Sequence, residues 1–334
     1  MPMRVSYTEM KREFDRVLCK VGFAPERAAT CAEIFAQASL DGVASHGLNR
    51  FPGFIRFIQQ GYVVADAEPE CTAAFGAWEQ WDGHLGPGPL NALVCTERAL
   101  ELARANGVGC VALCNTNHWM RGGTYGWRAA QAGFAFLCWT NTTPNMPAWG
   151  ARACHLGNNP FVLAVPRQEG PVVLDMAMSQ FSYGRLTVAE RSGEQLPVPG
   201  GFDADGNLTT DPGAIHASMR PLPIGYWKGS GLSLLLDLIA ALLSGGQTTY
   251  QIGQQETEYG VSQVYVAFDL ARAGSPSRID QLVDEVIRDL HGAAPDVQGG
   301  RVRYPGERAL RTREENLARG IPVDPDIWEQ VQVL

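Results

Sequence analysis

Short apolar runs alternate with a helical pattern in the middle of the chain, and this alternation limits the fold most. Residues 108–114 and 134–140 are apolar and have the length of buried strands. Residues 124–132 between them have helical spacing, and further strands are expected at 161–166 and 171–175. Strand–helix–strand alternation of this kind favours an α/β domain.

Caps and periodicity predict the elements around this core. Ser6 and Glu9 form a capping-box pattern that opens a helix ending near Lys20. Pro25 opens a second helix, since the first helical position needs no N–H. The other expected elements are an interruption at 41–47, helices at 48–60, 231–244, 278–291, 314–319 and 325–332, an exposed excursion or hairpin at 192–214, and a strand at 263–269.

Charge and hydropathy exclude several classes of partner. The 334-residue chain has a formal net charge of −8, which argues against a general nucleic-acid surface but permits a local cationic pocket. The N-terminus shows no apolar core of a signal peptide. The longest apolar run, 232–243, contains Asp237 and is roughly half the ~20 residues that a membrane helix needs. We expect a buried core helix there, and neither membrane nor nucleic acid as a partner.

The eight cysteines indicate a reducing compartment. None forms a C-x-x-C pair, and most lie inside apolar runs. Buried free thiols in the cytoplasm account for this pattern, and we expect no metal site.

The segment Ser45–Arg50 carries the residue types that a keto-acid reductase needs. His46 and Arg50 are four residues apart and would share one face of a helix. Arginine can bind a carboxylate with two hydrogen bonds, and a histidine can protonate a carbonyl oxygen. Ser45 could orient the imidazole or the substrate oxygen. The alternative is a loop histidine beside an exposed arginine.

Three other segments could bind ligands. Residues 115–126, which include His118, follow a strand and lead into a glycine-rich helix start. They could bind an anion there, or they could form a packed loop. Residues 226–231 could bind a pyrophosphate or a carboxylate, or Ser230 could simply cap the next helix. Asp175 could accept hydrogen bonds from ribose hydroxyls or cap the next turn.

The chain lacks the usual dinucleotide fingerprint. Residues 83–88 read G-x-x-G-x-G rather than G-x-G-x-x-G, and Pro87 removes an N–H that a phosphate would need. A dinucleotide would therefore have to bind by a route other than the Rossmann one.

A set of motifs in order along nearly the whole chain resembles the malate/L-lactate dehydrogenase family, which is unrelated to the Rossmann dehydrogenases. The motifs are Ser45-His46-Gly47 with Asn49-Arg50, Glu79–Asp82, Asn117–Gly123, Trp139–Asn141, Trp149–Ala151, Phe181–Gly184, Gln195–Val198 and Tyr226–Gly231. Departures are Asn158 and Thr142, where threonine and serine are common.

The resemblance implies a fold and an assembly. We expect a non-Rossmann, mixed and largely antiparallel sheet flanked by helices, similar to that of sulfolactate dehydrogenase. Residues 1–75 would form a helical part that packs with C-terminal helices at about 305–334, and residues 76–304 would form the α/β core. The expected assembly is a homodimer with sites near the subunit interface.

The resemblance also implies a reaction and its residues. His46 would be the proton donor, assisted by Ser45, and Arg50 would bind the substrate carboxylate. The expected substrate is 2,3-diketo-L-gulonate, reduced to 3-keto-L-gulonate. Alternatives are ureidoglycolate, malate, lactate or a cyclic imino acid. A catalytically silent sugar-acid binding protein is the alternative from another class. His118, Asn141 and Thr142 would line the cleft.

The implied cofactor is NAD (NADH), and Arg308 leaves NADPH open because it could favour a 2′-phosphate. Of the three cofactor-binding segments that the resemblance implies, the third matches the family least securely. These segments comprise Gly170, Pro171, Val172, Val173, Leu174, Asp175 and Met176; Tyr226, Trp227 and Lys228; and Gly306, Glu307 and Arg308.

Overall fold

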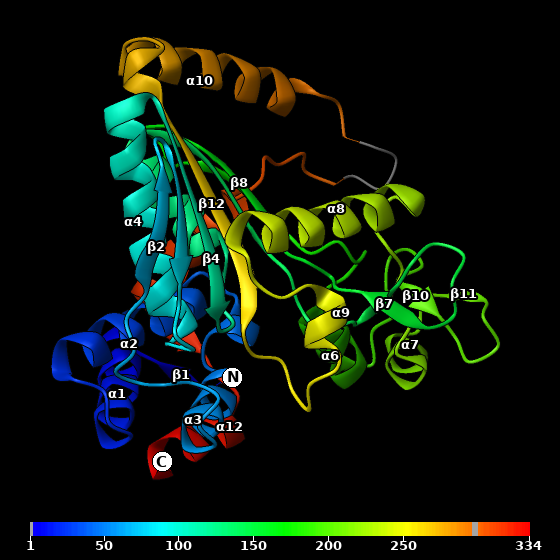
Figure 1. Cartoon of the computed structure of the whole chain (residues 1–334). Coiled ribbons are helices and arrows are strands. Elements are labelled where there is room, and N and C mark those ends of the chain that lie inside the picture. The colour runs from blue at the N-terminus through cyan, green and yellow to red at the C-terminus, as the bar shows by residue number, and fades with distance from the viewer. Residues whose placement is uncertain (1–2, 296–299) are drawn as a thin grey trace.

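A seven-stranded sheet forms the centre of the molecule (Figure 1). The computed structural model describes residues 3–295 and 300–334, so residues 1–2 of the predicted helical part and 296–299 of the predicted core lie outside the described residues. In order across the sheet, the strands are β2 (Glu70–Phe75), β3 (Trp78–Asp82), β4 (Val108–Thr116), β12 (Val261–Asp269), β5 (Phe134–Thr140), β8 (Phe161–Val165) and β9 (Val172–Met176).

The strand directions agree with the fold that the resemblance implied. Only β3 and β4 run parallel, and every other neighbouring pair in this sheet is antiparallel. The predicted mixed, largely antiparallel sheet is therefore confirmed. Strands predicted at 108–114, 134–140, 161–166, 171–175 and 263–269 all form.

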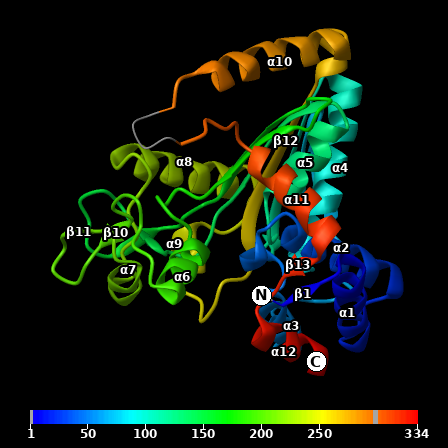
Figure 2. The ribbon, with the colours of Figure 1, turned by 180° about the vertical axis from the view of Figure 1, so that it is seen from behind.

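Helices cover both faces of the sheet, because successive residues of β12 pack into two different cores. Tyr265 and Ala267 belong to the core under α4 (Gly88–Asn106) and α5 (Gly123–Gln131). Val264, just before them, belongs to the core under α8 (Trp227–Ser244), and Val266, between them, packs against the same core. Successive strand residues point to opposite faces, so the two cores lie on opposite sides of the sheet. Figure 2 shows the side with α4 and α5, which α11 (Glu307–Arg319) also crosses.

The helix predicted at 231–244 forms, but the prediction that it is a buried core helix is wrong. The helix α8 begins earlier, at Trp227, and only one of its faces packs on the sheet. Leu235 is 55% and Leu242 77% exposed, so the apolar run continues around to the outer face. By length and composition α8 could cross a membrane. However, its buried face contains Asp237, whose carboxylate accepts hydrogen bonds from the Asn141 amide and the Thr249 N–H, each at 2.8 Å.

Both ends of the chain build the helical part. Its core includes Phe14, Phe35 and Phe51, and the Phe14 and Phe51 rings stack with centroids 4.2 Å apart. The C-terminal segment joins this core through Ile321 and Trp328. Its elements are α1 (Tyr7–Lys20), α2 (Pro25–Leu40), η1 (Ala44–His46), α3 (Phe51–Gln59), α12 (Pro325–Val333) and the pair β1 (Arg4–Val5) and β13 (Ile321–Pro322).

These N-terminal elements follow the predicted caps. Ser6 caps α1 by accepting the Glu9 N–H, and Pro25 is the first residue of α2. The domain boundary at residue 75 stays a prediction, and β2 just before it pairs within the central sheet.

The predicted excursion at 192–214 contains a short hairpin of β10 (Gly201–Phe202) and β11 (Leu208–Thr209). It packs with α6 (Tyr183–Ser192) and with α7 (Pro212–Ser218), which the sequence analysis did not predict. The predicted helix 314–319 begins seven residues earlier, as α11. The remaining elements are β6 (Met146–Pro147), β7 (Cys154–Leu156), α9 (Thr249–Ile252), η2 (Leu270–Arg272) and α10 (Pro276–Gly292).

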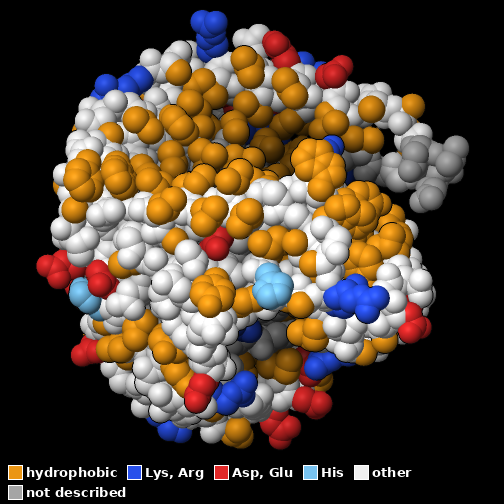
Figure 3. Space-filling model, turned by 45° about the vertical axis from the view of Figure 1, so that its right-hand side comes forward, with side chains coloured by type: hydrophobic (Ala, Val, Ile, Leu, Met, Phe, Trp, Pro, Cys, Tyr) orange, Lys and Arg blue, Asp and Glu red, His pale blue; other side chains and the backbone are white. Residues whose placement is uncertain are grey.

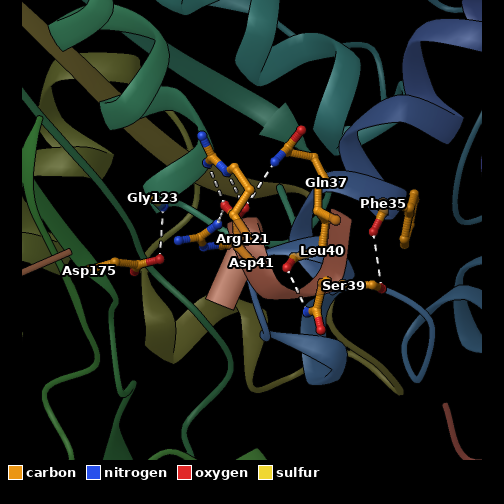
Figure 4. Close-up of polar contacts among 10 residues, drawn as sticks. Phe35, Gln37, Ser39, Leu40, Asp41, Arg121, Gly123 and Asp175 are labelled. Atoms are coloured by element: carbon orange, nitrogen blue, oxygen red, sulfur yellow. Dashed lines mark hydrogen bonds and ion pairs between the residues drawn. The ribbon is translucent and has the colours of Figure 1, made fainter. Parts of the chain in front are cut away.

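A buried ion cluster joins the helical part to the core. Asp41, at the end of α2, is 4% exposed and pairs with Arg121, which is 6% exposed (Figure 4). Arg313 of α11 donates two hydrogen bonds to the same carboxylate, at 2.7 and 2.9 Å. The Gln37 amide adds a fourth contact at 2.9 Å. One carboxylate thus holds together α2, the loop before α5, and α11.

Replacement of Asp41→Asn should destabilise the protein strongly. Two arginines would lose their carboxylate, and removing one partner of a buried pair costs about 3–5 kcal/mol. Urea unfolding measures this loss. The control is Glu33→Gln, which breaks the exposed Lys11–Glu33 pair (2.6 Å) and should cost about 0–1 kcal/mol. Equal losses in the two variants would contradict the importance of the cluster.

Candidate functional site

The turn that carries His46 is fixed by close packing under it. Leu48 N–H donates to the buried Ser39 hydroxyl at 2.8 Å. A Cβ on Gly47 would lie 2.8 Å from the Phe35 carbonyl oxygen, so no larger residue fits there without movement. The glycine after His46 therefore lets the loop lie directly against α2.

His46 lies among polar groups from three segments. Its Nδ1 is 3.0 Å from Ser45 Oγ, and its ring stacks on His118 with centroids 5.7 Å apart. The segment is not the helix that the sequence analysis assumed, because η1 ends at His46 and Arg50 is the N-cap of α3. Arg50 is exposed and forms no ion pair within 4.0 Å in the described part of the chain.

Nearby charges set the protonation of both histidines. Burial lowers the pKa of His46, Asp175 raises it, and Arg50 and Arg121 lower it further. Burial, Arg50 and His46 together hold the pKa of His118 well below its usual value. The His118 Nδ1 accepts the Met120 N–H at 3.0 Å, so the neutral ring carries its proton on Nε2. A hydrogen-bond donor, His118 Nε2, therefore lies on the ring that stacks against His46.

Asp175 connects the sheet to this cleft. Its Oδ2 accepts the Gly123 N–H at the start of α5, at 2.8 Å (Figure 4). Asp175 thus binds the start of α5, which lies earlier in the chain, rather than capping the turn that follows it, and its contact with ribose stays a prediction. Because Asp175 also raises the pKa of His46, its carboxylate lies within electrostatic reach of the imidazole.

The three predicted cofactor segments meet along β9 and its extension. Val173 N–H donates to Pro305 O at 3.0 Å, next to Gly306. Farther along, Ile224 N–H donates to Met178 O at 2.8 Å, just before Tyr226. One continuous stretch thus touches both of the other segments, with Asp175 between the two contacts.

Side chains in the third segment have different roles. Arg308 is exposed, as a phosphate-binding residue must be. Glu307 is buried and binds His291 at 3.0 Å and Arg311 at 2.6 Å, so its side chain is occupied within the fold. Burial opposes a low pKa for Glu307, but the hydrogen bond and charge of His291, the Tyr304 N–H and the charge of Arg311 hold that pKa below its usual value. The backbone at Gly306, with φ of 96°, remains the accessible part.

The second segment is an exposed aromatic surface. Tyr226 is the N-cap of α8, and Trp227 is 66% exposed. The Tyr226 ring lies 4.9 Å from that of Trp149, and Lys228 Nζ lies 6.0 Å from the Trp227 ring. Capping by Ser230 is wrong, because its hydroxyl instead accepts the Trp149 N–H at 2.7 Å.

Two predicted cleft residues are buried in the fold. Asn141 donates to Asp237 at 2.8 Å and to Gln247 O at 2.7 Å, and it accepts the Ser262 N–H at 2.8 Å. Its side chain therefore connects three segments and has no free N–H for a substrate. Thr142 is also buried, and its hydroxyl lies 3.3 Å from Asn159 Oδ1.

Metal and thiol chemistry find no support at this site. Within residues 3–295 and 300–334, no three His, Cys, Asp or Glu residues are arranged to hold a metal ion. All eight cysteines are free, as predicted. Cys19 and Cys71 are exposed, whereas Cys31, Cys95 and Cys138 are buried.

Comparison with known proteins agrees with this architecture. A sequence model described as malate/L-lactate dehydrogenase matches residues 5–332. The chain is 44% identical to 2,3-diketo-L-gulonate reductase of Citrobacter koseri over 334 residues, covering 99% of this chain and 100% of that protein. The reductase of the same name from Klebsiella pneumoniae is also 44% identical, with the same coverage. The chain belongs to the malate/L-lactate dehydrogenase family.

Solved structures show the same fold. Malate dehydrogenase from Entamoeba histolytica superposes with a TM-score of 0.94 at 23% identity, covering 100% of this chain and 97% of that one. Sulfolactate dehydrogenase from Methanocaldococcus jannaschii gives 0.87 at 27% identity, with 98% and 95% coverage. The family's sheet and flanking helices are thus present along the whole chain.

Several residues of the site escaped the sequence analysis as site residues. Asp41 and Glu258 stand in no motif, and only their spatial neighbours show their importance. Gly184 and Arg121 occur in family motifs, but nothing in the sequence shows what they touch. In the structure, a Cβ on Gly184 at the start of α6 would lie 2.7 Å from Ser45 Cβ.

Replacement of Gly184→Ala should therefore impair the site more than the fold. The added methyl group would push Ser45, and with it His46, out of position, and a 1 Å misplacement can cost roughly 100-fold in rate. Steady-state kinetics and thermal unfolding measure the two effects. Gly292→Ala, at an exposed glycine with open space around it, is the control and should change neither. Full activity in Gly184→Ala would show that the contact does not matter.

Proposed function

We propose that this protein reduces the C2 carbonyl of 2,3-diketo-L-gulonate to give 3-keto-L-gulonate, with NADH as the reductant. The observation that carries the proposal is the cleft in which His46 stacks on His118, with Arg50 and Asp175 in electrostatic reach. The 44% identity to proteins named 2,3-diketo-L-gulonate reductase supports the substrate.

His46 is the proton donor in this proposal. Its Nδ1 faces Ser45 Oγ at 3.0 Å, which leaves Nε2 for the substrate. A protonated ring donates Nδ1–H to the serine hydroxyl and passes the Nε2 proton to the C2 oxygen as that oxygen gains charge. His118 Nε2–H can hydrogen-bond to the same oxygen or to its neighbour. Both interactions stabilise the developing negative charge.

Arg50 binds the substrate carboxylate. Its guanidinium forms no ion pair within the described residues, so both of its N–H edges are available to an anion. A planar guanidinium fixes a carboxylate in two directions, which also fixes the face of the adjacent carbonyl.

The residues along β9 fit a nicotinamide dinucleotide. Gly170 and Gly306 have φ of 118° and 96°, and because a Cβ on Gly306 would lie 3.2 Å from Val173 N, this glycine lets the third segment lie directly against β9. A cavity of about 330 Å³ lined by His291, Arg301 and Val302 adjoins the third segment. When bound, the dinucleotide supplies the hydride that C2 receives. Exposed Arg308 is the residue that would favour a 2′-phosphate, so NADPH is the alternative reductant.

Other substrates for the same class of reaction remain alternatives. Ureidoglycolate, malate, lactate or a cyclic imino acid would use the same acid and carboxylate-binding residue. A catalytically silent sugar-acid binding protein is the alternative from another class. Turnover against a panel of 2-keto acids at the NADH absorbance band separates these cases. We also propose a cytoplasmic enzyme, which the eight free thiols support.

Replacement of His46→Ala should abolish most turnover but leave cofactor binding intact. Loss of a general acid typically costs ~10²–10⁴ in rate, whereas no predicted cofactor segment includes His46. Reduction of 2,3-diketo-L-gulonate gives the rate, and NADH fluorescence gives the binding. The exposed His155 of β7 provides the control, His155→Ala, which should behave as wild type. Near-normal turnover in His46→Ala would remove this residue from the role.

We further propose that the enzyme is a homodimer that covers the outer face of α8. Leu234, Leu235, Leu238, Ile239 and Leu242 are all exposed on this helix. Leu282 and Val286 of α10 are exposed as well. Figure 3 shows hydrophobic side chains gathered over the upper part of this face, the part where Figure 1 places α8 and α10. Large exposed apolar patches mark association sites in soluble proteins, and a second copy offers a matching surface.

Replacement of Leu235→Glu should convert the dimer to a monomer, because it puts a charge at the centre of that apolar face. Light scattering after size-exclusion chromatography measures the mass. Leu317→Glu is the control, since Leu317 is 60% exposed on α11, and its mass should equal that of wild type. A monomeric wild-type protein, or a dimeric Leu235→Glu variant, would refute the proposal.

A further inference from the structure

Residues 254–260, which precede β12, form a wall beside the loop that carries His118. Tyr259 stacks on Tyr62 with centroids 5.2 Å apart. The Tyr62 carbonyl accepts the Asn117 amide at 3.0 Å, one residue before His118. Gln247 fixes the segment at two points, by accepting from Gln255 at 2.6 Å and donating to Gly260 O at 3.1 Å. The wall is therefore held by side chains, not left as a loose connector.

This wall carries two carboxylates: Glu256 is exposed, and Glu258 is half-buried and faces the site. Its Oε2 accepts the Thr143 N–H at 2.8 Å, next to Thr142. Burial raises the pKa of Glu258 above its usual value, and the Thr143 hydrogen bond and the charge of Arg50 offset only part of this increase. Within the described residues, no ion pair shorter than 4.0 Å joins Glu258 to Arg50. The carboxylate thus lies within the electrostatic field of Arg50 but forms no ion pair with its guanidinium.

This arrangement places opposite charges at two points of one cleft. Arg50 attracts the C1 carboxylate of a keto acid, and the remaining chain of the substrate must extend past His46 and His118. A carboxylate accepts hydrogen bonds but donates none, so Glu258 suits hydroxyl groups on that chain. A second carboxylate there would meet a like charge in a half-buried site, which is unfavourable.

We propose that Glu258 is a specificity-determining residue, which favours polyhydroxylated 2-keto acids and disfavours 2-keto dicarboxylates. The inference rests on the proposed function. Glu258 binds the hydroxyl groups beyond C2, and its negative charge repels the second carboxylate of an acid such as oxaloacetate. The proton donor and the carboxylate-binding residue are the same for every substrate, so Glu258 changes selection and leaves the chemistry unchanged.

The test compares Glu258→Gln with wild type on three substrates: 2,3-diketo-L-gulonate, pyruvate and oxaloacetate. Glutamine keeps an oxygen for the Thr143 N–H and removes only the charge. We expect KM for 2,3-diketo-L-gulonate to rise roughly 10- to 100-fold, as expected for loss of a charge-assisted hydrogen bond. KM for oxaloacetate should fall, and kinetics with pyruvate, which has neither group, should stay unchanged. The kcat values should change little.

Two further variants make the result specific. Glu256→Gln, an exposed carboxylate two residues away on the same segment, is the matched control and should leave all three substrates unaffected. Glu258→Asp keeps the charge but shortens the reach, so it should still disfavour oxaloacetate while binding the sugar acid less well. It also provides the comparison if Glu258→Gln fails to fold, which thermal unfolding shows.

Each outcome decides between distinct conclusions. An equal loss on all three substrates would make Glu258 a structural residue and overturn the inference. Unchanged ratios among the three substrates would overturn it as well. If wild type turned over pyruvate or oxaloacetate but not 2,3-diketo-L-gulonate, the proposed substrate and the inference would both fail. Absence of any turnover in the wild type would instead overturn the proposed function itself.

Discussion

The site depends on the ion pairs and hydrogen bonds that the buried carboxylate of Asp41 forms. Arg121 leads directly into Gly122 and Gly123, whose N–H binds Asp175 at 2.8 Å. Arg313 belongs to α11, which starts at the third cofactor segment. His46 follows Asp41 by five residues in the same loop. One buried ion cluster therefore sets the distances among the proposed acid, the β9 edge and the cofactor-binding segments.

Much of the core was predictable because its signals are local. Apolar runs gave β4, β5, β8, β9 and β12, and the caps gave α1 and α2. The order of the strands was not readable from those runs, since β12 lies between β4 and β5 although it comes much later in the chain. Only the family resemblance predicted the largely antiparallel sheet. Pairing over such separations depends on tertiary contacts that no local pattern records.

The errors have equally physical causes. An apolar run does not show whether its outer side meets the protein's own core or another surface, so α8 was predicted to be buried although Leu242 is 77% exposed. The spacing of His46 and Arg50 was interpreted as one helix face, which is wrong, because a turn and a helix cap join them. Glu258 carried no signal, since a single glutamate in a polar connector resembles any solvated residue.

The charges around His46 suggest how the site would discriminate among ligands before any chemistry. In a chain of net charge −8, the positive field of Arg50 and Arg121 lowers the pKa of His46. A substrate carboxylate bound at Arg50 would cancel part of that positive field. Burial would still oppose protonation, but Asp175 would then act against a weaker cationic effect, and the pKa of His46 would rise. Binding of an anionic keto acid would thus itself favour the protonated imidazole that the proposed reduction requires, whereas a neutral carbonyl compound would leave the lowered pKa of His46 unchanged.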